Sequence, residues 1–137
     1  MARVVRGRVL VAGRGAGELL VCHEPLSFWG GYDPATGEII DRRHPLSGVL
    51  ARGRILAIPG TKGSSTTTAV LLEAIRRGTA PSAIVTVGAD GFVVLAAIVA
   101  EEMYDRTIPV LAIEKSAFDA LASGGIATVE EDGSLLM

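Results

Sequence analysis

The sequence is poor in cysteine, histidine, aromatic residues and long apolar runs. Cys22 is the one cysteine among 137 residues, so the chain cannot form an internal disulfide. One thiolate is also too few for an iron–sulfur cluster, which needs roughly three to four ligands. The two histidines, His23 and His44, lie far apart in sequence. We therefore expect no metal site within this chain.

Charge and hydropathy argue against two further classes of protein. The 13 basic and 15 acidic residues give a net charge of −2, and the basic residues form no single run, so we expect no nucleic-acid partner. The longest apolar run, residues 92–100, is far shorter than the ~20 residues of a membrane-spanning helix. Residues 1–8 are basic but lack the apolar stretch of a signal peptide. These features predict a cytoplasmic protein without a membrane segment.

The remaining pattern predicts one α/β domain over residues 1–137, with a mixed sheet and helices packed on it. Valine-rich and turn-bounded segments dominate the first part, and strands alternate with helices in the second part, which favours a largely parallel sheet there. The glycines at positions 13, 15 and 17 predict a turn over residues 12–17. We expect strands at 3–11, 18–22, 54–58, 83–87, 109–113 and 126–129, helices at 64–77, 91–104 and 116–122, and a tail or hairpin at 130–137.

Residues 23–48 form a segment rich in turn-forming residues. The segment holds half of the aromatic residues, Phe28, Trp29 and Tyr32, and residues 39–40 are the one short strand that we expect within it. Long irregular segments inside compact domains usually carry function or contact a partner. We expect the aromatic side chains to lie in the core or at a subunit interface rather than against substrate.

The most informative stretch is Pro-Gly-Thr-Lys-Gly-Ser-Ser-Thr-Thr-Thr at residues 59–68, between a predicted strand and a predicted helix. Such a turn lies at the carboxyl end of a strand, where α/β sheets bind ligands near helical amides. Ser64 could act there as a base or bind an anion, or Ser64 and Ser65 could simply cap the helix. A Walker phosphate loop needs Gly-Lys followed by Ser or Thr, but here Lys62 precedes Gly63. A hydrolase nucleophile would need a Gly-x-Ser-x-Gly elbow, which is also missing.

The Gly63-Ser64-Ser65 turn resembles the Gly-Ser-Ser turn of the swivel domain in aconitase-type hydro-lyases. In those enzymes an arginine that grips a substrate carboxylate follows the turn, whereas this chain has Thr66. Over nearly its whole length the chain is more specifically similar to the aconitase X swivel domain, the small subunit of aconitase X-type dehydratases. The stretches that carry the resemblance are residues 17–21, 24–31, 33–38, 44–48, 63–65 and 77–85.

The resemblance implies a swivelling β/β/α-type fold and a dehydratase that works only with a second chain. A large subunit would hold an iron–sulfur cluster, and the swivel subunit would supply Ser64 as the base that removes a proton beside a carboxylate. An ionised serine needs stabilisation by positive charge. Lys62 is either a candidate for that role or simply a solvated cation of the loop. His44 is either part of the cleft or packed within the irregular segment. The predicted substrate-binding residues are Gly63, Ser65, Thr66, Lys62 and His44.

The resemblance leaves two substrates open, cis-3-hydroxy-L-proline and mevalonate 5-phosphate. Residues 100–110 are more similar to the hydroxyproline type, which we favour, although the Thr66-Thr67-Thr68 run matches neither type closely. A hypothesis of another class is a non-catalytic binding or regulatory module, in which the glycine turn binds a small anion and the aromatic segment docks a partner. A large chain with three well-spaced cysteines encoded beside this one would favour the dehydratase.

Overall fold

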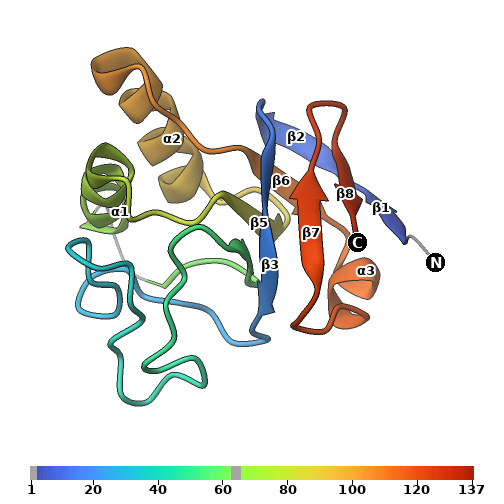
Figure 1. The fold of residues 1–137 in the computed structure, drawn as a ribbon, viewed down its shortest axis with the longest axis horizontal. Helices are drawn as coiled ribbons and strands as arrows, with labels where there is room; N and C mark the ends of the chain where they lie inside the picture. Colours follow the sequence, from blue (N-terminus) through green and yellow to red (C-terminus); the bar gives the residue numbers. More distant parts are fainter. Residues whose placement is uncertain (1–2, 63–65) are drawn as a thin grey trace.

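The computed structural model describes residues 3–62 and 66–137, and these form a mixed eight-stranded sheet with three helices (Figure 1). The strands are β1 (Val4–Arg6), β2 (Arg8–Val11), β3 (Gly15–Val21), β4 (Ile55–Ala57), β5 (Ala83–Val87), β6 (Val110–Ile113), β7 (Ile126–Val129) and β8 (Ser134–Leu136). The helices are α1 (Thr66–Arg77), α2 (Gly91–Tyr104) and α3 (Lys115–Asp119). The predicted α/β class is confirmed, and residues 130–137 form the predicted hairpin, because β7 and β8 pair antiparallel.

The sheet curls so that its two edges are joined by the chain itself. The strand order is β1-β8-β7-β3-β4-β5-β6-β2, with β3, β4, β5 and β6 parallel to one another. The edge strands β1 and β2 are separated in sequence only by Gly7, whose amide donates to the carbonyl oxygen of Gly133 at 2.8 Å. A Cβ at Gly7 would lie 2.5 Å from the carbonyl oxygen of Ala112. The single strand predicted over residues 3–11 is therefore wrong, because the chain changes partner at this glycine.

Two hydrophobic cores lie on the two faces of the sheet. Alternate residues of each central strand point to opposite faces, so Leu56 faces one core and Ile55 the other. The helix-side core includes Leu20, Leu26, Phe28, Tyr32, Leu56, Leu71, Ile84, Val93, Ala96 and Val110. The interior core, enclosed by the curled sheet and α3, includes Val5, Leu19, Ile55, Val85, Leu111, Phe118, Val129 and Leu135. Burial on both faces explains why β4, β5 and β6 are almost continuously apolar.

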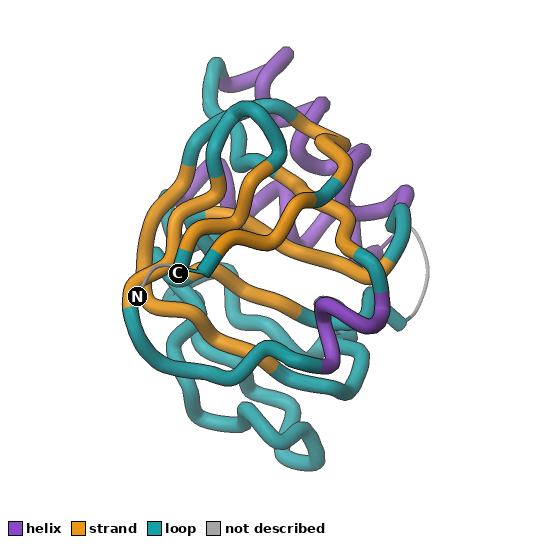
Figure 2. Tube along the Cα trace, turned by 90° about the vertical axis from the view of Figure 1, so that its right-hand side faces the viewer, coloured by secondary structure: helices purple, strands orange, loops and turns teal. Residues whose placement is uncertain are grey.

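The two long helices pack side by side over one face of the sheet, and α3 lies on the other side (Figures 1 and 2). Buried residues of α2 recur at helical spacing, namely Val93, Ala96, Ala97 and Ala100, and their small size lets α1 approach closely. The helix begins after Asp90 and ends at Asp105, which has a left-handed φ of 53°. The predicted helix at 91–104 is confirmed despite its β-branched residues, because tertiary burial outweighs local propensity.

Other element boundaries differ from the predictions for identifiable reasons. The turn predicted over residues 12–17 is wrong, because β3 already begins at Gly15. A Cβ at Gly17 would collide with the carbonyl oxygen of Gly53, so this glycine permits close packing within a strand. Residues 39–40 are no strand, since Ile39 makes only an isolated bridge to Tyr32. The helix predicted at 116–122 is the shorter α3. None of the helices in the described part of the chain has the length and apolar character to span a bilayer.

Candidate functional site

The carboxyl ends of the four parallel strands meet at one edge of the sheet. Residues 22–24 follow β3, residues 58–62 follow β4, residues 88–90 follow β5 and residues 114–115 follow β6. This edge of a parallel sheet is where ligands usually bind in α/β proteins. The described part of the stretch predicted to carry the chemistry that precedes α1, residues 59–62, therefore lies at the expected end of β4.

The irregular segment supports the first half of this loop. The amide of Leu26 donates to the carbonyl oxygen of Gly60 at 3.2 Å, and the amide of Lys62 donates to the carbonyl oxygen of Leu26 at 3.0 Å. Leu26 is completely buried, whereas the Lys62 side chain is exposed. The backbone of the fully buried Leu26 thus connects the irregular segment to this loop. The Lys62 side chain is therefore accessible to solvent.

The structure places two of the five predicted site residues of the loop, and the other three lie outside the described residues. Lys62 lies before α1 in the sequence, and Thr66 is the first residue of that helix. Both residues are exposed. Gly63, Ser64 and Ser65 lie outside the described residues, so the catalytic role of Ser64 and the binding roles of its two neighbours stay predictions. Because Thr66 is the first residue of α1, the positive end of that helix faces the end of the loop.

Asp90 holds the loop against the first turn of α2, a contact that the sequence analysis did not foresee. One carboxylate oxygen accepts from the amide of Thr61 at 2.8 Å and from its hydroxyl at 2.7 Å. The other accepts from the amides of Phe92 and Val93 at 3.1 and 3.2 Å. The available signal was an aspartate between Ala89 and Gly91 before an apolar run, which is typical of a helix N-cap. That signal could identify the cap but not the contact to Thr61.

His44 packs inside the protein next to Cys22. Its exposed fraction is 7%, its Nδ1 accepts from the amide of Leu46 at 3.1 Å, and its Nε2 lies 3.8 Å from the Cys22 sulfur. An Nδ1 that accepts requires the proton on Nε2, which then points at the sulfur. This arrangement favours the packing role for His44, and its substrate-binding role stays a prediction. Cys22 is buried as well.

The three aromatic residues of the irregular segment have two different environments. Phe28 and Tyr32 are buried in the helix-side core with ring centroids 5.1 Å apart. The Tyr32 hydroxyl donates to the carbonyl oxygen of Thr79 at 2.7 Å, and burial raises the pKa of this phenol well above its usual range despite the nearby Arg52. Trp29 is 68% exposed. Phe28 and Tyr32 therefore belong to the core, which was one of the two locations expected for the aromatic side chains, the other being a subunit interface.

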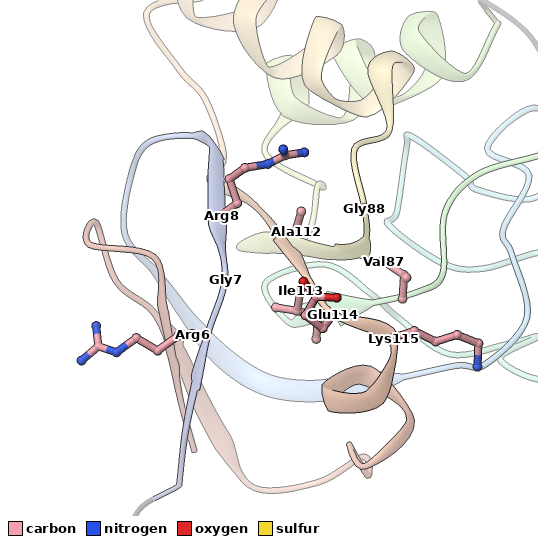
Figure 3. Close-up of a pocket in the computed structure, with 9 residues that line it drawn as sticks. All are labelled: Arg6, Gly7, Arg8, Val87, Gly88, Ala112, Ile113, Glu114 and Lys115. Atoms are coloured by element: carbon pink, nitrogen blue, oxygen red, sulfur yellow. The ribbon is translucent and has the colours of Figure 1, made fainter.

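A cavity of about 510 Å³ lies where β1 meets β2, beside the carboxyl ends of β5 and β6 (Figure 3). Its lining includes three cationic residues, Arg6, Arg8 and Lys115, but their side chains point in different directions. Arg6 is engaged by Asp132 at 3.7 Å, and Lys115 by Asp119 at 2.7 Å. The cavity is therefore no convergent anion site.

The described residues form no site for a metal cluster. Within residues 3–62 and 66–137, no group of three or more His, Cys, Asp and Glu side chains is arranged to hold a metal ion. Cys22 is buried against His44, and no second cysteine exists in the sequence. An iron–sulfur cluster of the type implied by the resemblance does not fit these residues.

A curled mixed sheet with α1 and α2 on one face, and the loop of residues 58–62 at the carboxyl end of β4, defines an α/β domain of the swivel type. The family model described as "Aconitase X swivel domain" matches residues 4–137, and the chain belongs to this family. The holo-form crystal structure of Thermococcus kodakaraensis aconitase X has the same fold, with a TM-score of 0.84 and 32% identity, over 97% of this chain and 96% of that chain.

Two curated relatives carry different names. The chain is 50% identical over 122 residues to the cis-3-hydroxy-L-proline dehydratase of Pseudomonas aeruginosa, which covers 89% of this chain and 21% of the relative. It is 46% identical over 100 residues to the phosphomevalonate dehydratase small subunit of Methanothermobacter thermautotrophicus, covering 72% of this chain and 76% of the relative. The chain thus spans about a fifth of the hydroxyproline dehydratase that it matches.

Proposed function

We propose that this chain is the swivel subunit of an aconitase X-type dehydratase and that Ser64 is its catalytic base. The observation that supports the proposal is the position of residues 59–62, which follow the carboxyl end of β4 and precede α1 in sequence. The same loop carries the Gly-Ser-Ser sequence of the family resemblance. The family membership and the dehydratase names of the relatives support the reaction class.

In the proposed reaction, Ser64 accepts the hydrogen of the carbon beside the substrate carboxylate as a proton. The electron pair of that C–H bond forms the double bond, and the hydroxyl on the next carbon leaves, so that water is released overall. A serine hydroxyl is a very weak acid, so its ionised form needs nearby positive charge. The start of α1 and the exposed ammonium group of Lys62 are the candidates that the described residues offer.

The proposal requires a second chain. A large subunit would hold the iron–sulfur cluster, which supplies a Lewis acid when bound. This chain would bring the base and close the site, and by itself it would have no activity. The name of the Methanothermobacter relative, a small subunit, supports such a division of the enzyme.

We propose cis-3-hydroxy-L-proline as the substrate, supported by the 50% identity to the Pseudomonas enzyme over 89% of this chain. Mevalonate 5-phosphate is the second candidate. The observation that favours it is the 46% identity to the Methanothermobacter small subunit over 72% of this chain.

The proposal is tested by anaerobic co-expression of this chain with its large partner. Each substrate is offered to the wild-type complex, to Ser64→Ala and to the control Ser116→Ala, which makes the same chemical change at an exposed residue of α3. We expect the wild-type and control complexes to dehydrate one of the two substrates. The turnover of the Ser64→Ala complex should be lower by a factor on the order of 10³ or more. Turnover by the isolated chain, or unchanged turnover by Ser64→Ala in an intact complex, would contradict the proposal.

A further inference from the structure

The start of α2 is linked to the candidate catalytic loop on both sides of residues 63–65. On the amino-terminal side, Thr61 donates both its amide and its hydroxyl to one carboxylate oxygen of Asp90. On the carboxyl-terminal side, the Thr68 hydroxyl donates to the carbonyl oxygen of Phe92 at 2.9 Å. The first turn of one helix therefore contacts both flanks of the segment that contains Ser64.

A helix cap alone does not explain the geometry of Asp90. Capping uses one carboxylate oxygen, which accepts from the amides of Phe92 and Val93. The second oxygen has the shorter contacts, 2.7 and 2.8 Å, and both come from Thr61, a residue 29 positions earlier. Hydrogen bonds to a carboxylate are shorter and stronger than bonds between neutral groups. Asp90 thus joins α2 rigidly to the loop that follows β4.

We propose that Asp90 is a positioning residue for the dehydration, acting through Thr61 to fix the loop that presents Ser64. The inference rests on the function proposed above. It adds to the site a residue from the connection between β5 and α2, whereas Ser64 belongs to the connection between β4 and α1. Asp90 touches neither substrate nor reacting atoms in this account. Its effect arises because small displacements of a catalytic group lower the rate of the chemical step much more than they weaken binding.

Three substitutions separate positioning from capping. Asp90→Ser keeps an oxygen that can cap α2 but is too short to reach Thr61. Thr61→Val removes only the hydroxyl donor and keeps the amide bond to Asp90. Thr61→Ser keeps both donors and is the matched control. Each is compared with wild type as the assembled complex, with melting temperature and co-elution measured alongside kcat and KM.

We expect Asp90→Ser to lower kcat on the order of 10- to 100-fold with KM little changed. Thr61→Val should show a smaller loss of kcat, and Thr61→Ser should behave like wild type. In the Asp90→Ser complex, backbone hydrogen exchange of residues 60–62 should become about tenfold faster, while exchange at the start of α2 stays as in wild type.

The positioning role is overturned if kcat of Asp90→Ser stays within about twofold of wild type. It is equally overturned by unchanged hydrogen exchange at residues 60–62, a measurement that needs no substrate. Ser64→Ala, assayed in parallel, separates the two proposals. An inactive Ser64→Ala beside a fully active Asp90→Ser would refute the positioning role alone, whereas an active Ser64→Ala would refute the proposed base.

Discussion

The helix-side core and the interior core are similarly apolar but differ in how polar groups are used around them. In the interior core, strand residues such as Leu111, Ile55 and Val85 pack on one another and on Phe118. Beside the interior core, the Ser123 side chain bonds only to the backbone of Val21. Around the helix-side core, side-chain hydrogen bonds hold the irregular segment and the loop after β4. Tyr32 reaches Thr79, and Asp90 reaches Thr61.

This difference indicates that the two cores have different roles, stabilisation of the sheet in one case and positioning of loops in the other. Apolar packing is nondirectional, so the interior core stabilises the curled sheet without fixing the loop that carries the candidate site. Hydrogen bonds are directional, and those on the helix side hold the irregular segment and the loop of residues 59–62 in place. Substitutions in the interior core should therefore change stability, and substitutions at the helix-side bonds should also change catalysis.

The largest effect on stability is expected for Leu111→Ala in the interior core. Leu111 is 1% exposed, and truncating a buried leucine costs about 2–5 kcal/mol. Urea unfolding measures the loss, with Leu95→Ala on the exposed face of α2 as the control, for which about 0.5 kcal/mol or less is expected. The kcat of the assembled Leu111→Ala complex should match that of the wild type. A large drop in kcat would contradict the claim that the interior core affects stability and not catalysis.

A smaller loss is expected for Gly17→Ala within β3. The new Cβ would collide with the carbonyl oxygen of Gly53, so the two segments must separate at a cost of about 1–3 kcal/mol. Gly91→Ala is the matched control, because a Cβ there meets nothing within 4 Å and alanine favours a helix. Thermal unfolding should show a lower Tm for the first variant and an equal or higher Tm for the second. Equal Tm values for Gly17→Ala and wild type would refute the close-packing role.

The smallest effect is expected for Tyr32→Phe, which removes the hydrogen bond to Thr79 and costs about 1 kcal/mol at neutral pH. Burial raises the pKa of Tyr32 in the folded state, so the unfolded chain ionises first. The wild type should then lose stability as the pH rises above about 10, the ordinary tyrosine pKa, and the loss continues toward the folded pKa. Tyr32→Phe lacks this component. Parallel urea titrations with the same pH slope in both proteins would contradict the buried phenol.

Much of the fold could be predicted from local patterns. Residues 83–87 and 91–104 match β5 and α2, because continuous apolar runs and turn residues define them within the sequence itself. The split between β1 and β2 could not be predicted, since it depends on Ala112 and Gly133, which lie more than 100 residues away. The glycines of β3 were predicted as a turn for the same reason, because the backbone that each approaches, Ser82 for Gly15 and Gly53 for Gly17, is distant in sequence.

The candidate site was predictable in its composition and not in its support. The Gly-Ser-Ser turn and Lys62 are adjacent in sequence, so a motif can identify them. Asp90 is 29 positions from Thr61, and the contact exists only because β4 and β5 are neighbouring parallel strands. His44 could be interpreted in two ways until its ring was found beside Cys22.

The most direct test of the central claim is release of hydrogen from substrate labelled with deuterium at the carbon beside its carboxylate. The measurement follows transfer of label to water by wild-type and Ser64→Ala complexes under anaerobic conditions. If Ser64 is the base, the wild-type complex releases label at least as fast as it forms product, and an intact Ser64→Ala complex releases almost none. Label release by Ser64→Ala at the wild-type rate would show that another group removes the proton.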